Sequence, residues 1–125
     1  MASIVMTVGV ALAFCGVGLG AFGAHGLTRR VTADRLKTYQ TGVQYQLFHS
    51  LAILVTGLAA FRFAPAALLV WAAWLFVAGI VLFSGSLYFL ALVRLPARWG
   101  VITPLGGLCF LGGWALWLVA LATRL

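Results

Sequence analysis

The chain has 125 residues, of which 65% are hydrophobic and 7% are charged, and its formal net charge is +7 at pH 7. This composition leaves almost nothing from which to build a water-facing domain. The positive charge could indicate a nucleic-acid partner, but the basic residues stand at the ends of apolar segments, where anionic lipid headgroups explain them, so no nucleic acid is expected.

Charged residues divide the chain into four uncharged stretches, at 1–28, 38–61, 63–93 and 99–123. About 20 mainly apolar residues are enough for a helix to cross ~30 Å of hydrocarbon. We therefore predict an all-α, membrane-embedded four-helix transmembrane bundle, a single domain over 1–125 with helices at about 3–25, 33–61, 65–93 and 103–123. The first stretch is not expected to be a cleaved signal peptide, because no Lys or Arg precedes its long apolar segment.

Turn and capping residues predict where these helices begin and end. The first helix should end at Gly26. Thr32 is expected to cap the second, which should continue without a break through the membrane. Pro65 should begin the third helix, and Thr103 and Pro104 are expected as the cap and first residue of the fourth.

Basic residues are unequally distributed between the two sides of the predicted bundle. The side with loops 26–32 and 94–102 carries Arg29, Arg30, Arg35, Lys37, Arg94 and Arg98, and the other side carries Arg62 and Arg124. Because cytoplasmic loops are enriched in Lys and Arg, we expect both loops in the cytoplasm and both termini outside.

In that orientation the polar residues gather in the cytoplasmic half of the bundle. They are His25, Gln44, Tyr45, Gln46, His49, Ser84, Ser86, Tyr88 and Thr103. One interpretation is packing, because interhelical hydrogen bonds hold transmembrane helices together. The other is a functional site, because a polar or ionisable side chain at depth is costly and often has a role, with His49 as the first candidate. Both interpretations remain open at this stage.

Small residues recur at helical spacing and are expected where the helices approach closely. The glycines predicted to serve helix packing are Gly16, Gly20, Gly23, Gly42, Gly85, Gly106, Gly107 and Gly113.

No metal or cofactor is expected. Cys15, His49 and Cys109 fall at similar depth on three helices and would make a soft ligand set for Cu(I) or Zn(II), but cysteines without CxxC spacing are more often apolar core residues. Bis-histidine haem is disfavoured because His25 and His49 differ in depth by about two helical turns. Without a nucleophile–base pair, an orienting acid or a phosphate-binding loop, an enzyme is not expected.

Four motifs resemble a known family. They are GAFGAHG at 20–26, TGVQYQ at 41–46 followed by His49, GSLY at 85–88 and ITPLGG at 102–107. In this order they are similar to the YgdD-like small membrane proteins, catalogued as domain of unknown function 423, over essentially the whole chain. The resemblance implies a four-helix protein of the bacterial inner membrane without an established activity, and adds weight to His25, Tyr45, Gln46 and His49. Cys15 and Cys109 are not part of the pattern.

Two functions from different classes follow. The first is a non-enzymatic packing, accessory or assembly module that binds itself or a larger membrane complex. The rival is a small oligomeric transporter, pore or lipophilic-ligand binder that uses the polar layer. A transporting form would need an oligomer, because four helices enclose little volume.

Overall fold

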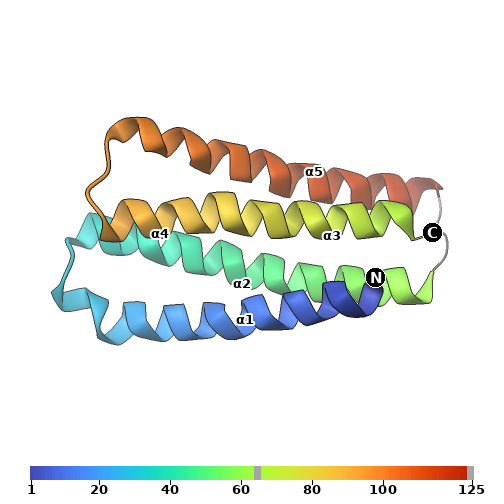
Figure 1. The fold of residues 1–125 in the computed structure, drawn as a ribbon, viewed down its shortest axis with the longest axis horizontal. Helices are drawn as coiled ribbons and strands as arrows, with labels where there is room; N and C mark the ends of the chain where they lie inside the picture. Colours follow the sequence, from blue (N-terminus) through green and yellow to red (C-terminus); the bar gives the residue numbers. More distant parts are fainter. Residues whose placement is uncertain (64–65, 124–125) are drawn as a thin grey trace.

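The computed structural model describes residues 1–63 and 66–123, and almost all of this part of the chain is helical. Its long helices are α1 (Ala2–His25), α2 (Ala33–Arg62), α3 (Ala67–Gly79), α4 (Gly85–Leu92) and α5 (Ile102–Thr123). A π-helical segment, η2 (Ile80–Ser84), joins α3 and α4 into one rod. The described residues therefore form four rods that lie side by side, each long and apolar enough to cross a membrane (Figure 1). The predicted four-helix transmembrane bundle is confirmed.

The first two helices follow the boundaries expected from the sequence closely. α1 ends at His25 and Gly26 follows with φ −86°, so the glycine is not needed for a left-handed conformation. A 3-10 turn, η1 (Leu27–Arg29), leads to α2. There the Thr32 hydroxyl accepts a hydrogen bond from the Arg35 backbone N–H at 3.3 Å, as the capping prediction requires.

The third rod departs from the prediction of one regular α-helix. The expected helix start at Pro65 lies outside the described residues. Farther along, the Gly85 N–H bonds to the Ile80 carbonyl, five residues back, and this inserts one extra residue into the helical turn. The insertion was not predictable from the apolar composition, because every residue from Ile80 to Phe83 is equally compatible with an α-helix in lipid.

The prediction that Thr103 caps the fourth helix is wrong. A 3-10 segment, η3 (Ala97–Val101), runs directly into α5 at Ile102, so Thr103 lies inside the helix. Its hydroxyl is 2.6 Å from the Ser86 hydroxyl of α4. The Thr103 hydroxyl, which the sequence predicts as a helix cap, therefore forms a tertiary hydrogen bond instead.

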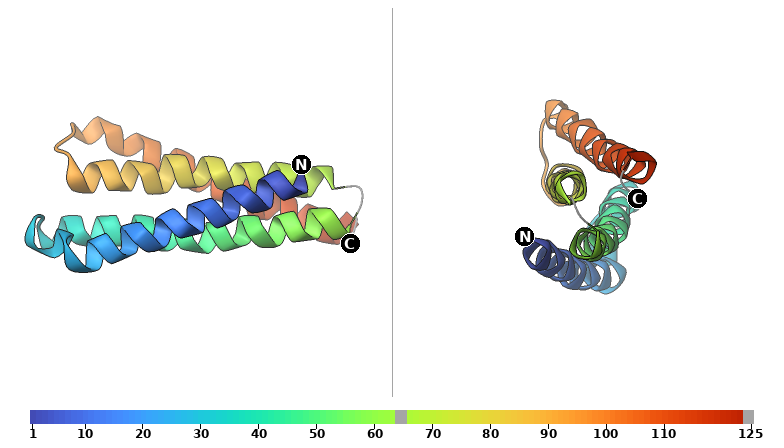
Figure 2. Two further views of the ribbon diagram at one scale, coloured as in Figure 1. Left: turned by 60° about the horizontal axis from the view of Figure 1, so that its bottom comes forward. Right: turned by 90° about the vertical axis from the view of Figure 1, so that its right-hand side faces the viewer.

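The helices are arranged as a row of neighbours rather than as a closed ring. α1 packs against α2, the α3–α4 rod packs against both α2 and α5, and α1 and α5 lie on opposite sides (Figure 2). Buried residues form one cluster around Ile53, Phe76 and Phe110 and a second around Tyr39 and Val43. The loops after α1 and after α4 lie at one end of the bundle, and the start of α1 and the end of α5 lie at the other (Figure 1).

Candidate functional site

Gln46 connects three helices through its carboxamide. The side chain is 3% exposed. Its Nε2 donates to the Leu12 carbonyl of α1 at 2.8 Å, and its Oε1 accepts from the Tyr88 hydroxyl of α4 at 2.6 Å. Both ends of the amide are therefore satisfied inside the protein, which is what a buried polar group in lipid requires.

A second set of bonds continues this network toward the loop end of the bundle. The Ser84 hydroxyl donates to the Gly42 carbonyl at 2.7 Å, and the Tyr39 hydroxyl donates to the Leu19 carbonyl at 2.5 Å. The rings of Tyr39 and Tyr88 lie 5.2 Å apart. These bonds tie α1, α2 and the α3–α4 rod together, so this part of the polar layer has a packing role.

His49 is buried and uses both ring nitrogens. Its Nδ1 is 2.9 Å from the Tyr45 carbonyl, and its Nε2 accepts from the Trp114 indole N–H of α5 at 3.1 Å. Because an indole only donates, Nε2 carries no proton, and Nδ1–H donates to the Tyr45 carbonyl. The imidazole also stacks on Phe110, with ring centroids 3.7 Å apart. The histidine is thus held neutral, as a bridge between α2 and α5.

The remaining predicted members of the polar layer lie elsewhere. Ser86 and Thr103 bond to one another between α4 and α5. His25 is exposed at the end of α1, and Gln44 is exposed on the outer face of α2. Tyr45 is 39% exposed, and no hydrogen bond to its hydroxyl is found in the described part of the chain. The predicted single layer is therefore an inner network with separate outer residues.

Several contributors were missed by the sequence reasoning. Trp117 donates to the Thr56 hydroxyl at 2.8 Å, in parallel with the bond from Trp114 to His49. A signal for both bonds exists: the tryptophans are three residues apart on α5, and their acceptors are seven residues apart on one face of α2. Pairing the two periodic faces would have required knowing that side chains of α2 and α5 meet, although the α3–α4 rod, and not α5, packs directly against α2.

Most of the predicted packing glycines lie at close helix contacts. On α1, Gly16 faces Leu47, Gly20 faces Val43 and Gly23 faces Tyr39, all of α2. The other glycine contacts are Gly42 with Tyr88, Gly106 with the backbone of Phe83, and Gly113 with Phe76. Gly85 and Gly107 are different, because a Cβ at either position would meet no atom closer than 3.9 Å. For these two the packing interpretation does not hold.

The residues considered for metal binding or catalysis are not assembled. Cys15 is exposed on α1, whereas Cys109 is half-buried on α5. Within residues 1–63 and 66–123, no three His, Cys, Asp or Glu side chains lie close enough together to hold a metal ion. Ser84 and Ser86 bond to backbone carbonyls and to Thr103, not to His49.

An open groove follows the α2–α5 seam on the outside of the bundle. It has a volume of about 580 Å³, and its lining includes Tyr45, His49, Phe83, Phe110 and Trp114. Tyr45 and Trp114 in its lining are 39% and 45% exposed, so the groove opens to the outside of the bundle.

Comparisons with known proteins agree with this architecture. The family model described as a protein of unknown function, DUF423, matches residues 19–107. The chain is 44% identical to the UPF0382 membrane protein YwdK of Bacillus subtilis over 108 residues, 86% of this chain and 87% of the relative. It is 50% identical to the UPF0382 inner membrane protein YgdD of Escherichia coli K12 over 109 residues, 85% of this chain and 79% of the relative. No solved structure matches it. With its four candidate spans, the chain therefore belongs to the UPF0382 (DUF423) family of multi-pass inner-membrane proteins.

Proposed function

We propose that the protein is a non-enzymatic membrane module that works by binding other transmembrane helices, either of a second copy or of a larger membrane complex. The polar groups of its interior support this proposal, because they already bond to one another or to backbone carbonyls within the protein. The carboxamide of Gln46, the ring nitrogens of His49 and the hydroxyl of Ser84 all bond within the protein. Groups that remain free to bind a partner lie on the outer surface.

The observation that carries the proposal is the position of Gln44. Its side chain is exposed on α2, and its carboxamide has no hydrogen-bond partner among the described residues. Two residues farther on, Gln46 reaches the Leu12 carbonyl in the middle of α1, so Gln44 lies at the depth of the hydrocarbon. An amide facing lipid without a partner is costly, and such residues commonly bond across helix–helix interfaces.

The surroundings of Gln44 suit a helix partner. Gln44 lines a shallow groove of about 380 Å³ between α1 and α2, together with Gly20, Leu47 and Phe48. Gly20 in the lining has no side chain that would keep another helix away, and the exposed Phe48 ring adds apolar contact area. The groove thus offers both the close approach and the hydrogen bond that association in lipid needs.

Replacing Gln44→Leu tests this proposal. We expect the variant to fold but to lose its partner, because leucine removes the interfacial hydrogen bond without changing the bundle interior. Interhelical hydrogen bonds contribute about 0.6–1.7 kcal/mol each, so the fraction associated should fall by about 3- to 20-fold at limiting concentration. Native mass spectrometry of protein extracted gently from its own membrane measures that fraction and the identity of the partner.

Thr7→Val is the matched control. Thr7 is also polar and exposed, but its hydroxyl already bonds to the Ser3 carbonyl of its own helix at 2.8 Å. Its replacement should leave the assembly unchanged. Assembly that survives Gln44→Leu, or that is lost equally in both variants, would rule out this face of α2 as the interface.

A second candidate function, a binder of lipophilic ligands, is favoured by the groove between α2 and α5. There the Tyr45 ring lies against the rings of His49, Phe110 and Phe83, and its hydroxyl has no hydrogen bond in the described part of the chain. A flat apolar molecule with one hydrogen-bond acceptor would match these groups. A non-lipid mass that stays with the single chain in the same spectrum would support this function instead.

For the orientation, we propose that both termini face outward. In the sequence, six basic residues lie in or beside the loops after α1 and after α4, and two, Arg62 and Arg124, lie near the ends of the second and fourth apolar stretches. Cytoplasmic loops carry the excess of Lys and Arg. A reporter that is active only in the cytoplasm, fused after Leu125, should be inactive, and the same reporter inserted in the loop after Arg29 should be active. The reverse pattern would overturn the orientation.

A further inference from the structure

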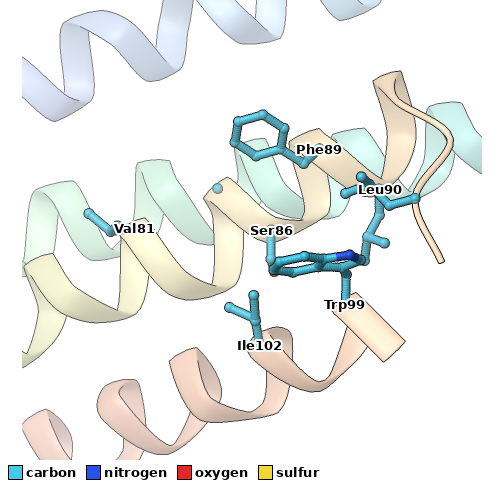
Figure 3. Close-up of a pocket in the computed structure, with 8 residues that line it drawn as sticks. Val81, Ser86, Phe89, Leu90, Trp99 and Ile102 are labelled. Atoms are coloured by element: carbon cyan, nitrogen blue, oxygen red, sulfur yellow. The ribbon is translucent and has the colours of Figure 1, made fainter. Parts of the chain in front are cut away.

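A pocket lies between α4 and α5 (Figure 3), at the end of the bundle where the two helices diverge toward their connecting loop (Figure 1). Its volume is about 370 Å³, within the ~300–1,000 Å³ range of small-molecule sites. The lining is Val81, Gly85, Ser86, Phe89, Leu90, Leu95, Trp99 and Ile102. Neither candidate function above uses this pocket.

The chemistry of the lining fits a hydrocarbon chain. Ser86 has the only side-chain hydroxyl in the lining, and this group is already bonded to the Phe83 carbonyl at 2.8 Å and to Thr103 at 2.6 Å. The other side chains are apolar apart from the indole N–H of Trp99. A ligand inside the pocket would therefore find apolar contacts and almost no hydrogen-bond partners.

The shape of the pocket fits a lipid that enters from the bilayer. Val81 and Phe89 on its side are 61% and 62% exposed, so the pocket opens toward the membrane. Its lining runs along the α3–α4 rod from Val81 to Leu90, roughly 14 Å at 1.5 Å per residue, and continues to Leu95 in the loop. That is about half of the ~30 Å hydrocarbon thickness, the depth reached by one acyl chain.

Positive charge stands at the loop end of the pocket. Arg94 and Arg98 are exposed and flank the lining residues Leu95 and Trp99 in sequence. The only acidic side chain of the protein, Asp34, belongs to the first turn of α2. The Trp99 indole lies between α4 and the start of α5, next to Ser86 and Ile102 (Figure 3). Tryptophan favours the headgroup level of a membrane, and basic pockets between transmembrane helices bind anionic headgroups.

We propose that this pocket and the two arginines form a binding site for one anionic phospholipid. The acyl chain occupies the pocket beside Gly85 and Phe89, and the phosphate of the headgroup binds Arg94 and Arg98. The site is independent of the helix-binding face on α2, because the two lie on different helices and different sides of the α3–α4 rod.

The headgroup part of the proposal is tested by competition between two lipids. The purified full chain is placed in nanodiscs containing phosphatidylglycerol and phosphatidylcholine with the same acyl chains, and native mass spectrometry counts the lipids that remain bound. We expect one retained phosphatidylglycerol. Since each arginine near a membrane surface contributes about 1 kcal/mol, Arg94→Gln and Arg98→Gln should each lower the preference about fivefold.

The matched control for charge is Arg62→Gln, at the opposite end of the bundle, where the guanidinium lies over the Phe63 ring at 5.5 Å. This variant should keep the preference. An equal loss in Arg62→Gln would mean that net charge alone retains the lipid, and equal retention of the two lipids by the unmodified protein would mean that no anionic site exists. Either result overturns the proposal.

The acyl-chain part is tested by filling the pocket. A Cβ at Gly85 meets nothing closer than the Ile80 carbonyl at 3.9 Å, so Gly85→Leu should fold and place its side chain in the pocket. Retention of both lipids should then be lost. Gly18→Leu is the control, because nothing lies within 4 Å of a Cβ there and the residue is far from the pocket in sequence, on α1. Unchanged retention in Gly85→Leu would refute the pocket as the site.

Discussion

Gly106→Ala is expected to separate α5 from the α3–α4 rod and to destabilise the bundle more than any other single methyl addition. A Cβ at Gly106 would overlap the backbone N, the Cα and the Cβ of Phe83. A side chain could rotate away, but a backbone held in the π-helical segment cannot. Overpacking usually costs about 1–3 kcal/mol, and a clash with backbone belongs at the upper end of that range. Denaturation with sodium dodecyl sulfate in mixed micelles, followed by circular dichroism, measures the loss in unfolding free energy.

The neighbouring glycine provides a control with the opposite expected sign. At Gly107 the nearest atom to an added Cβ is in the Phe83 ring at 4.0 Å, so a methyl group fits. Alanine is favoured over glycine within a helix by up to about 1 kcal/mol, so Gly107→Ala should be neutral or stabilising. If the two variants unfold at the same detergent concentration, the close approach of α5 to the π-helical segment does not occur in the folded protein in micelles.

Gln46→Leu is expected to weaken the contacts among three helices at once. Leucine nearly keeps the volume, but the Leu12 carbonyl loses a donor, and the hydroxyl of the half-buried Tyr88 loses its acceptor. An unpaired buried donor costs about 1–3 kcal/mol, so the unfolding free energy should fall by that amount. The same detergent titration measures it.

A double-mutant cycle with Tyr88→Phe separates the hydrogen bond from other effects of the substitution. If the bond from the Tyr88 hydroxyl to Gln46 is formed in the membrane, the two changes together should cost less than their sum, by about 0.6–1.7 kcal/mol. Strictly additive costs would contradict the bond. Gln44→Leu is the matched substitution two residues away, and it should leave the unfolding free energy unchanged while it reduces association.

The contrast between Gln44 and Gln46 indicates that the outer surface of this bundle, and not its interior, binds a partner. Both are glutamines of α2 within the same motif, yet one is buried with two partners and the other faces lipid without any among the described residues. The buried glutamine stabilises the fold. The exposed one has a hydrogen-bonding capacity that the protein itself does not use, which is the property expected of an interface residue.

The α-helical transmembrane class and the number of spans could be predicted from the sequence because they depend on local properties. Four uncharged apolar stretches, interrupted by basic residues, have few alternatives in a membrane, where only helices or closed barrels satisfy the backbone. The Thr32 cap was predictable for the same reason, since it depends on residues three positions apart. The motifs of the chain likewise predicted the family correctly.

Which polar residues work together was decided only by the tertiary structure. His49 was the first candidate from the sequence, but its partner was not predictable. Within the described part of the chain, His49 accepts a hydrogen bond from Trp114, 65 residues away, whereas the side chains of His25 and Gln44 meet no hydrogen-bond partner on another helix. Thr103 was predicted as a cap and instead bonds to Ser86. The interruption at Ile80–Ser84 and the spare space at Gly85 have no local signal. In lipid an apolar side chain has a similar free energy whether it faces the bilayer or the protein. Hydrophobic patterning therefore does not indicate which face of a helix turns inward. That face is determined by the pairing of specific glycines and polar side chains between helices.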